Sequence, residues 1–253
     1  MTRSYVTAAE ARNMPGLRIA FSAGMPGPWG EAVRCIFDIK QIDYVPVIQE
    51  IGEANEELQA WTGQSSAPVA MLDDDRPRTH WSEMLMLAER LQPEPSLIPR
   101  DERQRALMFG LCHELCGEDG FGWVMRTLLF DLLEKHGNRP AEIMLRKYEG
   151  GRGIDHCWER ARAIMELLAH QLEDQEAAGS DYLVGDRLSA ADIYWTTFSN
   201  MVSSMDLAKC PMPELYQWFG TEAVHELNLM PPEILIRHRD RILDRHFILP
   251  MWF

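Results

Sequence analysis

The stretch Tyr182–Trp195, YLVGDRLSAADIYW, decides how the second half of the chain is organised. A glycine-containing loop runs into Leu188, and Ser189 and Asp192 then form an S-x-x-D helix start. The Ser189 side chain is expected to accept a hydrogen bond from the Asp192 amide, while the Asp192 carboxylate accepts one from the backbone of Ser189. This capping box predicts a core helix and contributes about 1 kcal/mol or more when buried. Its role is structural, and we do not expect a binding site there.

Helical periodicity continues on both sides of this stretch. Apolar residues recur every three or four positions over Asp155–Glu176, which predicts a long amphipathic helix. Asp101–Leu115 and Phe121–His136 indicate two helices separated by glycines, and Glu233–Leu243 indicates the last one. Residues 138–153 have a looser pattern that is typical of an inserted excursion. The chain after residue 100 is therefore predicted to be almost entirely helical.

The N-terminal third has the pattern of a small α/β domain. Leu17–Ser22, Asp43–Gln49 and Ala67–Leu72 are short, apolar and partly β-branched, which predicts strands. Helical segments follow each of them, and Arg78–Trp81 is expected to form a fourth, very short strand. The predicted order is βαβαββα, ending at the proline-rich linker 93–99.

Composition and charge exclude several classes of function. The 253 residues are 46% hydrophobic and 25% charged, which is typical of a globular protein with one large or two modest domains. A net charge of −14 argues against binding to nucleic acids or anionic membranes. The sequence contains no apolar run of the roughly 20 residues that a membrane span needs and no secretory signal, so a cytoplasmic protein is expected. The five scattered cysteines indicate buried thiols, and no metal site is expected.

Three motifs, in this order and with this layout, resemble the glutathione transferase superfamily. SAPVAML (residues 66–72) places a proline before a strand, and WSEMLMLAERL (81–91) opens the helix that closes the first domain. The third is the capped loop and helix YLVGDRLSAADIYW, and the resemblance extends from Leu17 to about Asp206. It implies a thioredoxin-like glutathione-binding domain over 17–92 and an all-helical bundle domain over 100–253 that forms the wall for a second substrate.

The resemblance also implies where glutathione would bind. Pro68 is expected to be cis, so that the backbone of Ala67 pairs with the cysteinyl part of glutathione. Glu83 stands at the acidic position that typically meets the γ-glutamyl ammonium, at a helix N-terminus that suits a carboxylate. Met84 replaces the usual serine and leaves only backbone amides for that carboxylate, and Ser82 is a candidate substitute. The alternative for Ser82 and Glu83 is a helix N-cap followed by a first-turn acid.

The side chain that usually activates the glutathione thiol is missing. The family places Tyr, Ser or Cys there, often directly before a proline that opens the helix, whereas this chain has Gly27 before Pro28. The thiol pKa, about 8.5 or a little above, has to fall for thiolate to form near neutral pH. Ser22 and the indole N–H of Trp29 are the candidate catalytic groups, and backbone amides of the same turn or Cys35 are further stand-ins. A strand-end hydroxyl, a packed aromatic ring and a buried thiol are the respective structural alternatives.

His113, Trp123 and Arg126 border the glycine-rich break between two predicted helices and are candidates for the second-substrate pocket, with surface or core roles as the alternative. We therefore expect a glutathione transferase-like homodimer that conjugates its co-substrate glutathione to a small hydrophobic electrophile. The alternative is a non-catalytic glutathione- or ligand-binding protein, or an interaction scaffold that has lost the site. The apolar tail HFILPMWF (residues 246–253) is expected to pack on the body or in an interface.

Overall fold

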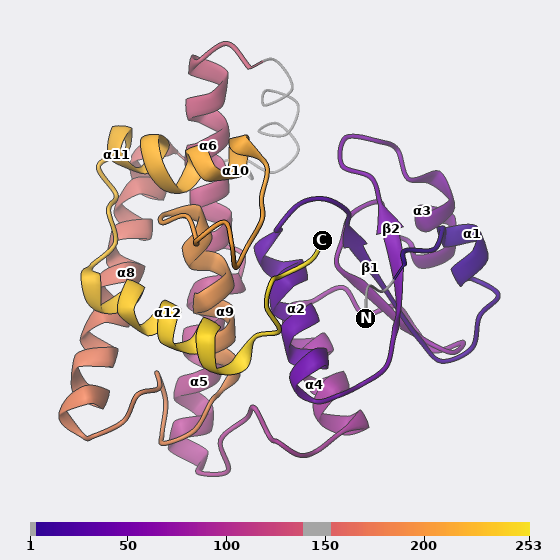
Figure 1. The fold of residues 1–253 in the computed structure, drawn as a ribbon, viewed down its shortest axis with the longest axis horizontal. Coiled ribbons are helices and arrows are strands. Elements are labelled where there is room, and N and C mark those ends of the chain that lie inside the picture. Colours follow the sequence, from indigo (N-terminus) through magenta and orange to yellow (C-terminus); the bar gives the residue numbers. More distant parts are fainter. Residues whose placement is uncertain (1–3, 139–152) are drawn as a thin grey trace. The chain divides into compact units, whose positions relative to one another are not determined.

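The computed structural model describes residues 4–138 and 153–253. The predicted excursion at 138–153 therefore lies, except for its two end residues, outside the described part. The chain forms two compact units, which Figure 1 shows with the sequence running from indigo to yellow. Unit 1 comprises the chain as far as Ser96 together with Leu207–Met212 and Phe247–Phe253, and unit 2 comprises Leu97–Asp206 and Pro213–His246.

Unit 1 is built on a three-stranded mixed sheet with the order β2-β1-β3. The central strand β1 (Leu17–Ser22) is buried at every residue except the last, because its apolar run is covered on both faces. It pairs in parallel with β2 (Val45–Gln49) and antiparallel with β3 (Val69–Leu72). The expected strand at Arg78–Trp81 is reduced to a single bridge between Arg78 and Ala70.

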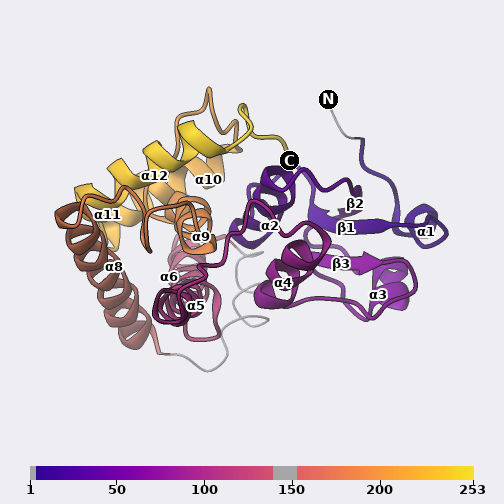
Figure 2. The same ribbon diagram turned by 90° about the horizontal axis from the view of Figure 1, so that it is seen from below.

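Helices cover both faces of this sheet (Figure 2). α2 (Pro28–Ile39) and α4 (Trp81–Leu91) pack together on one face. α1 (Ala8–Ala11) and α3 (Glu56–Thr62) lie on the other face. The second face closes over a small apolar cluster made of Ala8, Ala11, Ala20, Val47, Leu58 and Val69.

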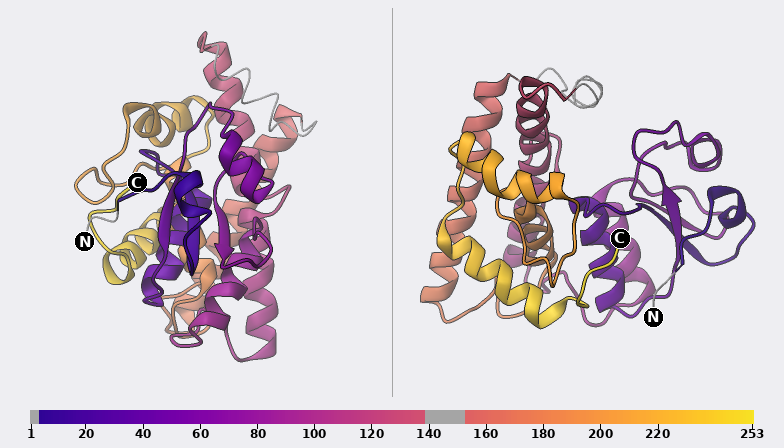
Figure 3. Two further views of the ribbon diagram at one scale, coloured as in Figure 1. Left: turned by 90° about the vertical axis from the view of Figure 1, so that its right-hand side faces the viewer. Right: turned by 45° about the horizontal axis from the view of Figure 1, so that its top comes forward.

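Unit 2 is entirely helical in the part that the structure describes. α5 (Glu102–Cys116) and α6 (Phe121–Lys135) follow each other in one column, and α8 (Ile154–Ala177) runs alongside α6 (Figures 1 and 3). The central helix α9 (Ala190–Phe198) is buried at all its residues. The remaining elements are the 3₁₀ turn Ser199–Met201, α10 (Glu214–Trp218), a π-helical turn Phe219–Ala223, α11 (Val224–Glu226) and α12 (Glu233–His246). These findings confirm the predicted fold class.

The capping box that was predicted from the sequence opens α9. The amide and the hydroxyl of Ser189 both donate to Asp192 Oδ2 at 2.8 Å. Asp192 is fully buried, and its Oδ1 accepts the amide of Leu183 at 2.7 Å. The same oxygen lies 3.1 Å from Nε2 of the buried His238 on α12. One carboxylate therefore fixes the preceding loop and the start of α9 by hydrogen bonds, and its distance to His238 Nε2 is a proximity without a hydrogen bond.

Candidate functional site

The register of the sheet brings two turns to the same end of unit 1. Ala20 of β1 is paired with Val69 of β3, and the two strands are antiparallel. The chain that leaves β1 after Ser22 and the chain that enters β3 through Ala67 and Pro68 therefore lie at one end of the sheet. The peptide bond between Ala67 and Pro68 is cis, as the resemblance implied.

The N-terminus of α4 reaches this end as well. After β3 the chain reverses, and Arg78 pairs antiparallel with Ala70. The residues that follow Arg78 therefore run back along β3 toward the end where β3 began. The start of α2, the Ala67-Pro68 bond and the start of α4 are thus grouped by topology, and we refer to them together as the three-turn site.

The first of these turns ends at Gly27, the N-cap of α2. Gly27 has φ −65° and provides no side-chain cap, and Pro28 occupies the first helical turn. The Gly27 amide donates to the carbonyl of Met25 at 2.9 Å. Because Pro28 has no N–H, the first helical amides of α2 belong to Trp29 and Gly30. A Cβ atom built on Gly27 would meet no atom within 4 Å, so this position has room for a side chain.

The two candidate catalytic side chains differ in their surroundings. Ser22 ends β1, and its hydroxyl donates to Oε1 of Gln49 on β2 at 2.6 Å. Its proton is therefore engaged within the sheet. Trp29 is half-buried in the first turn of α2. The sequence did not predict Gln49 as the partner of Ser22, because a polar residue at the end of an edge strand does not indicate which side chain it will bond.

At the start of α4 the sequence prediction of the N-cap was wrong by two residues. His80 is the N-cap, and its Nδ1 lies 3.4 Å from the Ser82 amide and 2.8 Å from the Ser82 hydroxyl. Glu83 completes the capping box by accepting from the His80 amide at 3.4 Å. Histidine is not among the residues preferred as N-caps, so the sequence favoured Ser82 instead.

Glu83 has a second partner at its other carboxylate oxygen. Nη1 of Arg76 donates to Glu83 Oε1 at 2.7 Å. Partial burial raises the pKa of Glu83, but the hydrogen bonds from Arg76 and from the amides of His80 and Thr79 lower it overall. The carboxylate is consequently held in its charged form, which is the form that would bind an ammonium group.

Met84 takes no part in the site through its side chain. It is 1% exposed and packs in the core of unit 1. Its amide donates to the carbonyl of His80 at 3.2 Å, as does the amide of Glu83 at 3.1 Å. In this chain the side chain at position 84 points into the core, so a serine at this position, as the resemblance implies, would not face the ligand.

The three candidates for the second substrate all lie in unit 2. His113 is exposed near the end of α5, and its ring fills the space beside Gly117, where an added Cβ would lie 2.6 Å from His113 Cε1. Trp123 and Arg126 are half-buried on α6, with the guanidinium 5.1 Å from the ring centroid. Burial raises the pKa of Tyr216 on α10, and the nearby Arg126 lowers it. The structure therefore brings together Trp123, Arg126 and Tyr216.

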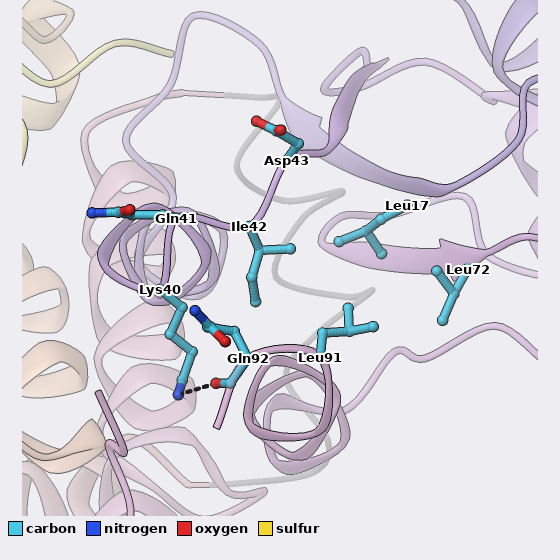
Figure 4. Close-up of a pocket in the computed structure, with 8 residues that line it drawn as sticks. All are labelled: Leu17, Lys40, Gln41, Ile42, Asp43, Leu72, Leu91 and Gln92. Atoms are coloured by element: carbon cyan, nitrogen blue, oxygen red, sulfur yellow. Dashed lines mark hydrogen bonds between the residues drawn. The ribbon is translucent and has the colours of Figure 1, made fainter. Parts of the chain in front are cut away.

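A pocket of about 340 Å³ lies at the opposite end of the sheet from the three-turn site (Figure 4). Leu17 and Leu72, which are paired in the sheet, form one side of it. Its remaining lining residues are Lys40, Gln41, Ile42, Asp43, Leu91 and Gln92.

Within residues 4–138 and 153–253, no group of three His, Cys, Asp or Glu side chains could hold a metal ion. No helix in those ranges is long and apolar enough to cross a membrane.

Comparisons with known proteins show what this chain is similar to. Residues 154–223 match the family model of the glutathione S-transferase C-terminal domain. A glutathione transferase from Pseudomonas putida, solved with glutathione disulfide, superimposes with a TM-score of 0.63 at 16% identity, over 93% of this chain and 90% of that one. A family member from Pseudomonas fluorescens with two glutathione molecules gives 0.62 at 15%, over 94% of both chains. The β-etherase LigF from a Sphingobium species gives 0.57 at 16%, over 89% and 99%.

No curated protein matches the chain. The structural likeness and the family match confirm the resemblance that the motifs indicated. The chain has the fold of the glutathione transferase superfamily, with a thioredoxin-like N-terminal domain and a helical C-terminal domain.

Proposed function

We propose that this protein binds glutathione at the three-turn site and conjugates its thiol to a small hydrophobic electrophile. The observation that carries the proposal is the start of α2. This helix has no side-chain cap, and it begins at the end of the sheet where the cis Ala67-Pro68 bond and the start of α4 also lie. The N-terminus of a helix carries a partial positive charge, which stabilises a thiolate.

Each part of glutathione has a partner in this proposal. The backbone of Ala67, held by Pro68, pairs with the cysteinyl part of the peptide. The Glu83 carboxylate binds the γ-glutamyl ammonium, and Ser82 at the start of α4 binds the γ-glutamyl carboxylate, whereas the Met84 amide already donates to the His80 carbonyl. The sulfur lies at the first turn of α2, near Trp29. Ser22 contributes less, because its hydroxyl proton already binds Gln49.

The reaction in this proposal is a transfer of the electrophilic carbon to sulfur. The thiol proton leaves to solvent, the thiolate electron pair forms the new S–C bond, and the leaving group departs with its own bonding pair. The resemblance assigns the hydrophobic acceptor to the helical domain, where His113, Trp123 and Arg126 are the candidate contacts. Trp123 and Arg126, whose guanidinium lies 5.1 Å from the ring centroid, support an aromatic acceptor, since both side chains have a flat face.

Calorimetric titration with glutathione, followed by steady-state conjugation assays on several aromatic and alkyl electrophiles, tests the proposal. We expect saturable binding in the micromolar to millimolar range and turnover that depends on glutathione. The absence of binding at millimolar glutathione would contradict the whole proposal.

A second candidate function is glutathione or ligand binding without catalysis. It is favoured by Gly27, which leaves the start of α2 without the usual activating side chain. The same two assays separate the candidates, because binding without turnover on any electrophile supports this one.

We also propose a homodimer in the cytoplasm. Met86 on α4 and Leu107 on α5 are large apolar residues that are 44% and 40% exposed, which supports an interface. All five cysteines are buried and form no disulfide, as is usual in a reducing compartment. Light scattering coupled to size exclusion is expected to give twice the chain mass of 29.1 kDa.

A further inference from the structure

Arg34 on α2 is the centre of a buried cluster that unites distant parts of the sequence. It is 4% exposed, and its guanidinium lies 4.2 Å from the ring of Phe21 and 3.8 Å from the ring of Trp252. Its Nη2 donates to the Tyr5 hydroxyl at 3.0 Å, and the rings of Tyr5 and Trp252 are 5.9 Å apart. Two segments that are far apart in sequence therefore converge on one arginine.

The anion beside this arginine is poorly compensated. Glu31, one turn earlier on α2, is 3% exposed, and both of its carboxylate oxygens lie 3.4 Å from Arg34 Nε. Among the residues that the structure describes, neither Glu31 Oε2 nor Arg34 Nη1 has a hydrogen-bond partner. Burial raises the pKa of Glu31 to about 7 although Arg34 lowers it. A buried ion pair with long, incomplete bonds does not recover the cost of desolvating its charges.

The segment Phe247–Phe253 closes this cluster, and we call it the strap. Met251 is buried, and its amide donates to the carbonyl of Lys209 at 2.7 Å. Trp252 covers the guanidinium of Arg34. This arrangement confirms the expectation that the apolar tail packs on the body. The strap itself contains no ionisable side chain.

We propose that protonation of Glu31 controls the docking of the strap on α2, so that the strap is held tightly in mild acid and loosens as the pH rises toward and above neutrality. When the strap is docked, Trp252 covers the guanidinium of Arg34, and Arg34 and its partner Glu31 are both buried. When it is released, water reaches both side chains and the charged carboxylate is stabilised. The inference does not depend on glutathione binding.

The sign of the pH dependence follows from the linkage between the proton and the strap. The pKa of Glu31 is about 7 with the strap docked. It falls toward the ordinary value of about 4.3 when water has access. Docking is therefore strongest at a pH below the pKa of Glu31 in the released state. Between that pKa and the pKa in the docked state, the docking constant falls by up to about tenfold per pH unit. Between about pH 6 and pH 8 the docking constant is expected to fall by about tenfold.

The other charged groups around Glu31 do not produce this dependence. Arg34 and Asp38 lie on the same helix, and Arg34 lowers the pKa of Glu31 whereas Asp38 raises it. Tyr5 faces the pair from the N-terminal segment, and burial raises the pKa of its hydroxyl above the usual range. Tyr44 acts on Arg34. His246, which precedes the strap, titrates at lower pH than usual because burial lowers its pKa. Because His246 is next to the strap and also titrates, the His246→Gln variant serves as its control.

Fluorine NMR on protein labelled with 5-fluorotryptophan follows the strap directly. The Trp252 resonance is assigned by its loss in Trp252→Phe, and the pH is varied from about 5 to 8.5, the range over which Glu31 changes charge. In the unmodified chain we expect a titrating resonance, together with amide exchange in residues 247–253 that rises by about tenfold between pH 6 and 8 beyond the intrinsic pH effect. In Glu31→Gln, which keeps the shape of the side chain without the charge, we expect a docked strap and a flat profile.

Two controls and one further variant complete the test. Ile248→Ala, at a strap position that is 65% exposed, and His246→Gln are both expected to keep the profile of the unmodified chain. In Trp252→Ala, carbon NMR of the glutamate carboxyls is expected to report a Glu31 pKa that has fallen toward the ordinary value. That measurement decides the matter if Glu31→Gln fails to fold. Any of three results would overturn the inference. They are a Trp252 resonance that does not change with pH, a titration in Glu31→Gln identical to that of the unmodified chain, and an unchanged Glu31 pKa in Trp252→Ala.

Discussion

At the scale of single residues, the structure sharpens the question that Gly27 poses. The residue has a φ of −65°, which any L-amino acid adopts, and an added Cβ would meet no atom within 4 Å. The glycine is therefore not required by the backbone or by packing. In the proposed function, activation of a thiol at this position would depend on the helix N-terminus, since residue 27 has no side chain.

We predict that Gly27→Ser increases the rate of glutathione conjugation. The new hydroxyl would donate to the thiolate, and a hydrogen bond to a charged group contributes about 1.5–3 kcal/mol, which corresponds to a rate increase of about tenfold or more. The pKa of bound glutathione is expected to fall in parallel, measured from the ultraviolet absorbance of the thiolate. Gly27→Ala is the matched control, since it adds the Cβ without the hydroxyl. Equal effects of the two substitutions would contradict the prediction.

Ser22 is predicted to be structural. Because its hydroxyl donates to Gln49 Oε1 at 2.6 Å, Ser22→Ala leaves that amide oxygen without this partner. The expected loss is about 1 kcal/mol in the free energy of unfolding. The conjugation rate is expected to remain within about a factor of two, because the substitution removes no donor aimed at the sulfur. Chemical denaturation and steady-state kinetics on the same preparation measure both effects, and a large loss of rate at unchanged stability would restore Ser22 as the catalytic group.

At the scale of elements, the start of α4 combines a cap with a candidate ligand-binding group. Glu83 accepts from the His80 amide with one oxygen and from Arg76 with the other. A ligand ammonium would therefore compete with Arg76, whose side chain is 63% exposed and free to move into solvent. The same carboxylate can serve the helix and the ligand in turn.

Substitutions at this pair are predicted to act in opposite directions on glutathione affinity. Glu83→Gln removes the charge that meets the ammonium, so the dissociation constant measured by calorimetry is expected to rise by about tenfold. Arg76→Ala removes the competitor, so affinity is expected to stay equal or to improve. A loss of affinity in Arg76→Ala as large as that in Glu83→Gln would indicate that the pair stabilises the turn and that Glu83 does not bind the ligand.

The capping box of α9 permits a prediction about stability. The two carboxylate oxygens of Asp192 accept buried hydrogen bonds, one from Leu183 and the other from Ser189. Asp192→Asn replaces one of these oxygens with an NH₂ group, which cannot accept. The expected cost is about 3 kcal/mol in the free energy of unfolding, because a buried donor is left without a partner. Ser189→Ala removes one hydroxyl and is expected to cost only about 1 kcal/mol. Denaturation followed by circular dichroism compares the two variants, and equal costs would show that the loop at Leu183 does not depend on Asp192.

How much of this was predictable from the sequence varies from one element to another. The S-x-x-D box could be predicted because its partners lie three residues apart, and the long helix α8 could be predicted because its apolar spacing is regular. Arg76, His80 and Gln49 were missed because their bonds depend on how the turn and the strands are placed in space. The fourth strand was overestimated, since a run of polar and aromatic residues at 78–81 makes one bridge and then enters α4.

At the scale of the whole molecule, the predicted proline-rich linker covers residues 93–99, and the chain up to Ser96 is part of unit 1. Lys40 on the C-terminal end of α2 explains the attachment. Its ammonium group is fully buried and lies 2.8 Å from the carbonyls of both Gln92 and Pro95 (Figure 4 shows the first). It also pairs with Glu89 on α4 at 2.7 Å. One lysine thus uses all three of its donors to fix this segment to the domain that precedes it.

We predict that Lys40→Met releases residues 92–96 from unit 1. Methionine fills a similar volume without donors, so two carbonyls lose their partner and Glu89 loses its ion pair. The expected cost is about 3 kcal/mol in the stability of unit 1. Limited proteolysis and hydrogen exchange are expected to increase at 92–96, while the helices of unit 2 keep their protection because their capping box and core are untouched. Lys135→Met, which removes an exposed pair with Asp131, is the matched control and is expected to change neither measurement. If both substitutions left the segment equally protected, proline stiffness and not Lys40 would be what orders this connection.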